Sequence, residues 1–269
     1  MKCPVDELME MLNEPCGLVM NGPHLRAMAA SPSTRLDLLE VLLQVCPTQV
    51  LGNPAFRLAM ATDSGLIGQL GVAGQAAIAG CETADPQLIR RLAARRTRSA
   101  RCRMAAAANP SCPPDMLWDY LRHRRPVRVA LAGNPALPDA LIAAILEDTS
   151  WQVREQIAMR PSLSEAFFSA VAGDADWHVR RSLAKNERLP KPIMHALVTD
   201  PYYRVREQVA ARQDLAPDLL AAMAAREQGH VVLSAVITNP STPEDALGHL
   251  TADLGSQVAT ALYRRQEAR

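Results

Sequence analysis

The chain has 269 residues, of which 48% are hydrophobic, and its formal net charge at pH 7 is only +1. That apolar content is ample for a folded core, and no run of 18 uncharged apolar residues predicts a transmembrane helix. Three acidic residues soon follow the lysine near the start, a pattern that argues against a secretory signal peptide. We therefore expect a soluble, cytoplasmic protein that does not bind membranes.

The chain is expected to divide into three segments of one continuous solenoid domain. Residues 1–23 are predicted to be an N-terminal capping segment. Degenerate repeats are expected over 24–99, where the repeat interval varies from 22 to 28 residues and the glycine-spaced stretch 62–80 is the least regular. Regular repeats are expected over 100–269.

The regular repeats have a period of about 26 residues, marked by an anchor that is most often Asn followed by Pro. The anchors of this part are Asn109, Asn134, Arg160, Asn186, Arg212, Asn239 and, weakly, Arg265. Upstream, Ser31, Asn53 and Cys81 occupy the same register. A fixed period of this size predicts a solenoid of stacked units.

Each repeat is predicted to be a helix, a proline turn and a second helix. Aliphatic residues lie seven and three positions before the anchor, which places them on one helix face, as with Val153 and Ile157. Proline in the anchor cannot continue the first helix. Helices of about 8 to 10 residues are marginal alone in water, so neighbouring repeats must stabilise them. The predicted fold class is all-α.

The Val-Arg, Leu-Ala and Asn-Pro elements recur together, as in Val127-Arg128-x-x-Leu131-Ala132-x-Asn134-Pro135 and Val153-Arg154-x-x-Ile157-Ala158-x-Arg160-Pro161. This motif resembles that of the leucine-rich repeat variant family of bacterial proteins, well over 100–269 and loosely over 24–99. The resemblance implies short helix pairs, alternating α and 3-10 or HEAT-like, in a right-handed superhelix. It implies a scaffold and no particular activity.

Some members of that family carry a cysteine-ligated iron–sulfur cluster, and we weigh it here as an alternative. The chain has no C-x₂-C spacing, which such clusters normally use. Cys46, Cys102 and Cys112 occupy positions where other repeats have Val or Leu, so we predict that they are buried. Cys3, Cys16 and Cys81 are then too few for a standard cluster. We predict no cofactor and no metal.

Motifs for catalysis are missing too. The six histidines are scattered, and the sequence contains no zinc-protease motif, nucleophile elbow or phosphate-binding loop. A DNA glycosylase built from HEAT-like repeats is a less favoured alternative, because it would need a basic cradle, whereas residues 131–269 carry a net charge of −3. We therefore predict a protein that is not an enzyme.

Positive charge is concentrated in residues 86–130, which hold eleven Lys or Arg against two Asp or Glu. The expected binding residues of this basic patch, within Arg90–Arg103, are Arg90, Arg91, Arg95, Arg96, Arg98 and Arg101. Guanidinium groups match carboxylates and phosphates, so an acidic protein surface and nucleic acid are both candidate ligands. A solvated or internally paired patch is the third possibility.

Two further columns recur in the regular repeats. Arginines six residues before the anchor are predicted to pair with acids twelve before it, and those acids are Asp148, Asp200, Glu227 and Asp253. Bulky residues nine before the anchor are Trp151, Trp177, Tyr203 and His230. They either begin each first helix and cover the seam between repeats or form an exposed aromatic strip. We predict a scaffold or adaptor that binds a protein, with nucleic acid as the alternative partner.

Overall fold

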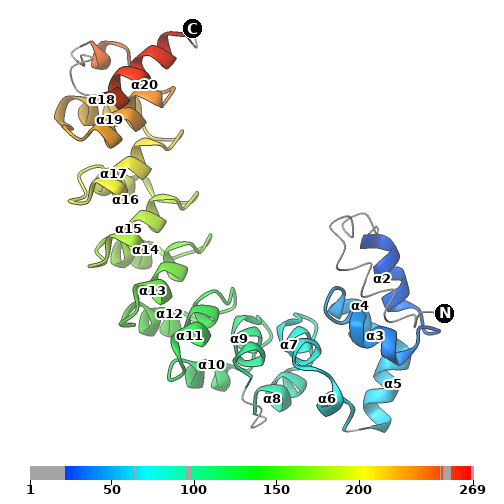
Figure 1. Cartoon of the computed structure of the whole chain (residues 1–269). Helices are drawn as coiled ribbons and strands as arrows, with labels where there is room; N and C mark the ends of the chain where they lie inside the picture. The colour runs from blue at the N-terminus through cyan, green and yellow to red at the C-terminus, as the bar shows by residue number, and fades with distance from the viewer. Residues whose placement is uncertain (1–21, 64, 95–98, 249, 251–255, 268–269) are drawn as a thin grey trace. The chain divides into compact units, whose positions relative to one another are not determined.

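The computed structural model describes residues 22–63, 65–94, 99–248, 250 and 256–267, and all regular secondary structure in these ranges is helical. The predicted all-α helical repeat is therefore confirmed (Figure 1). The chain forms two compact units, of which the first extends to Leu141 and the second begins at Ile142. The segment boundaries at 23/24 and 99/100 stay predictions, and most of the expected capping segment lies outside the described residues.

The first helix of each repeat begins nine residues before the anchor, with one exception. In the first unit these helices are α2 (Gly22–Ala30), α4 (Pro47–Gly52), α7 (Val72–Gly80), α9 (Ala100–Ala108) and α11 (Arg125–Ala132). In the second unit they are α13 (Trp151–Ala158), α15 (Trp177–Ala184), α17 (Tyr203–Ala210), α19 (His230–Thr238) and α20 (Ser256–Glu267). The exception is α4. Within each unit, successive first helices pack side by side.

The second helices are also short. They are α3 (Leu36–Leu42), α5 (Pro54–Thr62), α8 (Pro86–Ala94), α10 (Pro114–Tyr120), α12 (Asp139–Leu146), α14 (Glu165–Ala172), α16 (Lys191–Leu197), α18 (Pro217–Arg226) and the 3-10 helix η2 (Asp245–Leu247). The single-turn α6 (Leu66–Gln69) follows α5. The alternation of α and 3-10 helices, which the resemblance implied, is thus found only at η2 among the described repeats, and the HEAT-like alternative of two α-helices describes the others.

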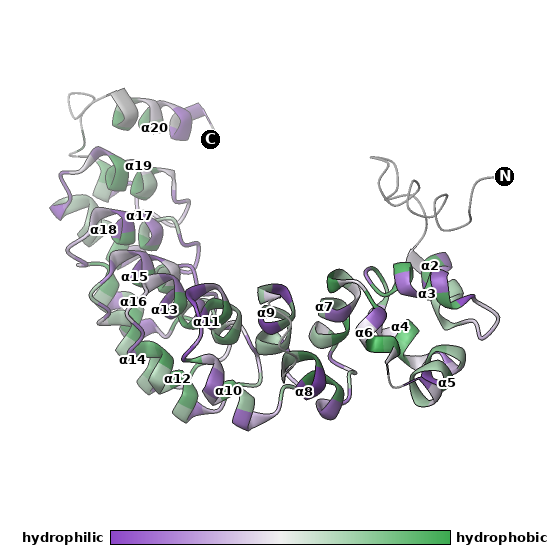
Figure 2. Ribbon diagram, turned by 60° about the horizontal axis from the view of Figure 1, so that its bottom comes forward, coloured by the Kyte–Doolittle hydropathy of each residue, from purple (hydrophilic) through white to green (hydrophobic). Residues whose placement is uncertain are grey.

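The core lies where the periodicity places it. In the second unit, Val153, Val179, Val205 and Val232 and their partners four residues later are fully buried between successive first helices. Figure 2 shows hydrophobic residues along these helices. Burying one aliphatic side chain contributes about 1.5–3 kcal/mol. Since each repeat shares its core only with its neighbours, stability accumulates repeat by repeat.

The anchor side chain ties each repeat to the one before it. Asn186 Nδ2 donates hydrogen bonds to the carbonyl oxygens of Ala158 (2.9 Å) and Arg160 (2.7 Å), and its Oδ1 accepts one from the Arg188 N–H (3.0 Å). The same pattern recurs at Asn53, Asn109, Asn134 and Asn239. Carbonyls at a helix C-terminus lack partners within their own helix, and the next anchor supplies them.

Arginine can replace asparagine in this role. Arg212 Nη1 donates to the carbonyls of Ala184 and Asn186, at 2.8 Å each. Arg265 Nη1 makes the equivalent bonds to Ile237 and Asn239. The Asn anchors, Arg212 and Arg265 thus all present an N–H group that reaches two carbonyl oxygens, whereas Ser31 and Cys81, the anchors of two upstream repeats, have no side-chain N–H group.

The cysteine positions follow the predicted packing. Cys46, Cys102 and Cys112 are buried, as predicted, and Cys81, which stands at an anchor position, is buried too. Burial, followed by the nearby Asp115 carboxylate, raises the pKa of Cys112 to about 11. Cys3 and Cys16 lie outside the described residues. Within those residues no cluster of three or more His, Cys, Asp or Glu side chains is arranged to hold a metal ion.

Among the helices that the structure describes, none combines the length and the apolar character that a membrane crossing requires.

Candidate functional site

Five rings from three successive repeats form a continuous stack in the second unit, which we call the aromatic strip. Its members are Trp151, His178, Trp177, Tyr202 and Tyr203. Trp151 and His178 stack with their centroids 4.2 Å apart, His178 and Trp177 at 3.7 Å, and Trp177 and Tyr202 at 4.3 Å. Tyr202 and Tyr203 meet in a tilted arrangement at 5.3 Å. Such contacts stabilise each pair by about 0.5–1.5 kcal/mol beyond the area buried.

The expected column supplies only part of this strip. Trp151, Trp177 and Tyr203 each begin a first helix, as the first interpretation of the column predicted. His178 and Tyr202, the sequence neighbours of Trp177 and Tyr203, provide the rings that bridge the repeats. They were not predicted, because the predicted column contains only the position nine residues before each anchor. His230 begins α19 and is exposed.

The strip is accessible and bordered by charge. Trp151, His178, Trp177 and Tyr202 are half-buried, while Tyr203 is 37% exposed. The guanidinium of the exposed Arg204 lies 5.8 Å from the Trp177 ring centroid and 5.6 Å from that of Tyr203, within cation–π range. One end of the strip therefore combines aromatic surface with a positive charge.

Asp176 orients His178, the ring of the strip between Trp151 and Trp177. Its Oδ1 lies 2.8 Å from His178 Nδ1 and accepts a hydrogen bond from the His178 backbone N–H at 2.9 Å. Burial raises the pKa of Asp176, but the bonds from the His178 backbone and ring outweigh it and hold that pKa below its usual value. The carboxylate thus keeps the imidazole in its stacked position.

The predicted pairing of arginines with acids forms a ladder beside the strip. Arg154 makes two hydrogen bonds to Asp174, Arg180 two to Asp200, and Arg206 two to Glu227, at 2.7–3.1 Å. Each arginine also donates to the carbonyl of the acid twelve residues before its own anchor, at 2.6–2.7 Å: Asp148, Asp174 and Asp200 respectively. Asp174 holds the equivalent position in its repeat, although it was not among the acids predicted to pair with arginine.

The ladder is largely withdrawn from solvent. The side chains of Arg180 and Asp200 are 11% and 3% exposed. Since these guanidinium groups bind a carboxylate and a loop carbonyl of the fold, they hold the loops that precede the first helices and so position the aromatic strip. We assign the ladder a structural role.

Comparison with known proteins establishes the fold. No protein-family model matches the chain, and no curated protein matches it. A solved structure of a leucine-rich repeat variant, described as having a novel repetitive structural motif, matches with a TM-score of 0.55. The match covers 98% of this chain and 96% of the other, at 20% sequence identity. This chain has the leucine-rich repeat variant fold.

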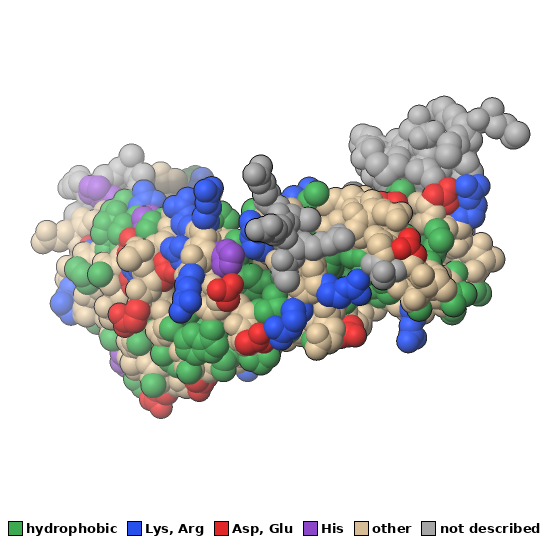
Figure 3. All heavy atoms as spheres, turned by 90° about the horizontal axis from the view of Figure 1, so that it is seen from below, with side chains coloured by type: hydrophobic (Ala, Val, Ile, Leu, Met, Phe, Trp, Pro, Cys, Tyr) green, Lys and Arg blue, Asp and Glu red, His purple; other side chains and the backbone are tan. Residues whose placement is uncertain are grey.

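Of the expected basic patch, the structure describes Arg90, Arg91 and Arg101. Arg90 forms a two-bond ion pair with Asp115, at 2.6 and 2.8 Å, on the surface of the first unit. Arg91 and Arg101 are exposed on α8 and α9. The remaining expected patch residues, Arg95, Arg96 and Arg98, lie outside the described residues. On the face seen in Figure 3, grey residues apart, Lys and Arg side chains are interspersed with Asp and Glu.

The ladder predicts a loss of stability in acid. Burial raises the pKa of Glu227, but the hydrogen bonds from Arg206 and from backbone N–H groups outweigh it and hold that pKa below its usual value. A carboxylate with a lowered folded pKa stabilises the fold above its unfolded pKa, and this contribution disappears as pH falls through the folded value. We expect the urea-unfolding midpoint of the wild-type protein to decrease below about pH 4.5. The Glu227→Gln protein should be less stable at neutral pH, and its midpoint should decrease less in acid. Equal pH profiles for the two proteins would contradict this assignment.

Proposed function

We propose that this chain is a non-enzymatic scaffold that binds a protein partner through the aromatic strip of its second unit. The observation that carries the proposal is the stack of five partly exposed rings across three repeats. Tyr and Trp supply much of the binding energy at protein interfaces, because they bury a large area at a small entropic cost. Rings already held by stacking lose little further freedom when a partner binds.

The charges around the strip favour protein over nucleic acid as its partner. Bases also stack on aromatic rings, but nucleic-acid binding requires basic groups that contact phosphates. The arginines of the ladder already bind carboxylates, and residues 131–269 carry a net charge of −3. Nucleic-acid binding through Arg90–Arg103 is the alternative, supported by the local excess of arginine in the first unit.

The strip can be tested with two tryptophan variants. We expect Trp177→Ala to raise the dissociation constant for an affinity-purified partner at least about tenfold, because truncating an interface hot spot removes about 2 kcal/mol or more of binding free energy. Trp118→Ala is the matched control, since Trp118 is 45% exposed on α10 of the first unit. Biolayer interferometry at 50 and 300 mM salt gives both affinities and their salt dependence.

The outcomes separate the two candidate functions. Wild-type affinity in a natively folded Trp177→Ala protein would exclude the strip as the binding surface. If Arg101→Glu abolishes binding instead, and the affinity falls steeply with salt, the basic patch is the interface. Titration with generic duplex DNA then decides whether its ligand is nucleic acid: a log–log salt slope of about −4.5 corresponds to five phosphate contacts.

A further inference from the structure

In one repeat the second helix starts at an irregular position, and a cavity lies beside that helix. In eight repeats the second helix starts five or six residues after the anchor, whereas α5 starts at Pro54, directly after Asn53. Asn53 caps this helix, since its Oδ1 accepts hydrogen bonds from the N–H groups of Ala55 (2.8 Å) and Phe56 (3.4 Å). The residues that follow form helices readily, whereas Asn109-Pro110 is followed by two further prolines, Pro113 and Pro114.

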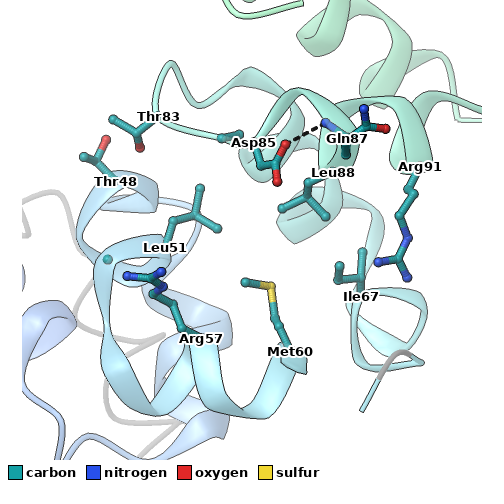
Figure 4. A pocket seen from close by; sticks show the side chains of 12 residues that line it. Thr48, Leu51, Arg57, Met60, Ile67, Thr83, Asp85, Gln87, Leu88 and Arg91 are labelled. Carbon is teal, nitrogen blue, oxygen red and sulfur yellow. Dashed lines mark hydrogen bonds between the residues drawn. The ribbon is translucent and has the colours of Figure 1, made fainter. Parts of the chain in front are cut away.

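At this irregular repeat a cavity of about 590 Å³ lies between α4, α5 and α6 on one side and α8 on the other, all in the first unit. Leu51, Met60, Ile67 and Leu88 supply most of its apolar lining (Figure 4). The volume lies within the range of small-molecule sites, about 300–1,000 Å³. It is an apolar hollow that the repeat pattern alone does not produce.

Charged groups border this hollow on both walls. Arg57 projects from α5 and Arg91 from α8 (Figure 4). The third charged group in the lining is Asp85, whose Oδ1 accepts a hydrogen bond from the Gln87 N–H (2.8 Å) at the start of α8. A carboxylate is stabilised at a helix N-terminus, so Asp85 already has a structural role. The formal charge of the lining is positive, and its sources lie at the edges of an apolar surface.

We propose that this cavity binds an aliphatic carboxylate. The hydrocarbon chain would lie against Leu51, Met60 and Leu88, and the carboxylate would accept hydrogen bonds from Arg57 or Arg91, whose guanidinium groups match its geometry. The described lining contains no aromatic side chain on which a nucleotide base could stack. A cationic ligand would meet two arginines against a single, already engaged carboxylate.

Three probes of equal chain length test the chemistry: octanoate, 1-octanol and octylammonium. We expect isothermal titration to show octanoate binding at least about tenfold more tightly than either of the others, because a charge-assisted hydrogen bond contributes about 1.5–3 kcal/mol. Amide NMR shifts should be concentrated in α4, α5 and α8. Equal affinity for octanoate and octylammonium, or shifts confined to other helices, would overturn the proposal.

Variants locate the site. Arg57→Gln or Arg91→Gln should weaken octanoate binding about tenfold, whereas Arg122→Gln, which removes an equal charge from an exposed residue outside the cavity lining and the Arg90–Arg103 patch, should leave it unchanged. Gly52→Leu should fill the cavity without backbone strain, since a Cβ there has no neighbour within 4 Å, and Gly22→Leu is its control. Wild-type affinity in both cavity arginine variants excludes this site. If Gly52→Leu does not fold, which circular dichroism will show, the arginine variants alone decide.

Discussion

Replacing the anchor Asn186 by alanine lowers the free energy of unfolding by about 3 kcal/mol. The substitution removes the donor for two backbone carbonyls and the acceptor for one N–H. Asn186 is buried, with only 7% of the residue exposed. Each buried polar group left without a partner destabilises a protein by about 1–3 kcal/mol. Urea unfolding followed by circular dichroism measures the effect.

Two replacements at Asn186 separate hydrogen bonding from packing: one keeps the shape of the side chain, and the other keeps its hydrogen-bond donors. Asn186→Asp has nearly the same shape but presents a negative carboxylate to two carbonyl oxygens, so it should destabilise at least as much as alanine. Asn186→Arg should destabilise least, because Arg212 makes the equivalent pair of bonds in the next repeat. Glu187→Ala, at an exposed neighbour, should change stability by less than about 0.5 kcal/mol. Equal effects of Asn186→Ala and Glu187→Ala would refute the role of the anchor.

Replacing Arg180 by methionine is expected to have an effect of similar or larger size, about 3–5 kcal/mol, because it leaves the buried Asp200 carboxylate without its ion-pair partner. The free energy of unfolding measured by urea denaturation tests this value. The double variant Arg180→Met with Asp200→Leu should recover much of the loss, since a buried ion pair contributes little more than a well-packed apolar pair.

The exposed pair Arg35–Asp37 provides the control for Arg180. Its side chains are 67% and 39% exposed, and such surface pairs contribute about 0–1 kcal/mol. Arg35→Met should therefore be nearly neutral. If Arg180→Met were equally neutral, the ladder would not hold the loops before α15 and α17, and the strip would depend on ring stacking alone.

These two networks explain how a chain with only 4% aromatic residues can hold five rings in register. The anchors join successive repeats at the C-terminal ends of the first helices. The ladder joins them at the loops that lead into the same helices. The strip lies where those helices begin, so both ends of each element that carries a ring are held by hydrogen bonds.

Some features of the site could be predicted because they repeat. Nine residues separate the start of a first helix from its anchor, so Trp151 and Trp177 could be placed at equivalent positions from the sequence. The Arg-to-acid pairing was predicted in the same way, since column members must face neighbouring repeats. Features that do not follow the register were missed: His178 and Tyr202 in the strip, the early start of α5, and the cavity lined by Arg57 and Arg91.

The sequence by itself determined the helical repeat, its period, the burial of Cys46, Cys102 and Cys112, and the pairing of arginines with Asp200 and Glu227, because each depends on a spacing that recurs every 26 residues or so. Only the tertiary structure showed that anchor side chains bind carbonyls of the preceding repeat, that the rings form one stack, and that the chain divides near Leu141. The anchor bonds and the ring contacts between repeats join residues that are far apart in the chain, and the directions of their side chains depend on packing and not on local periodicity.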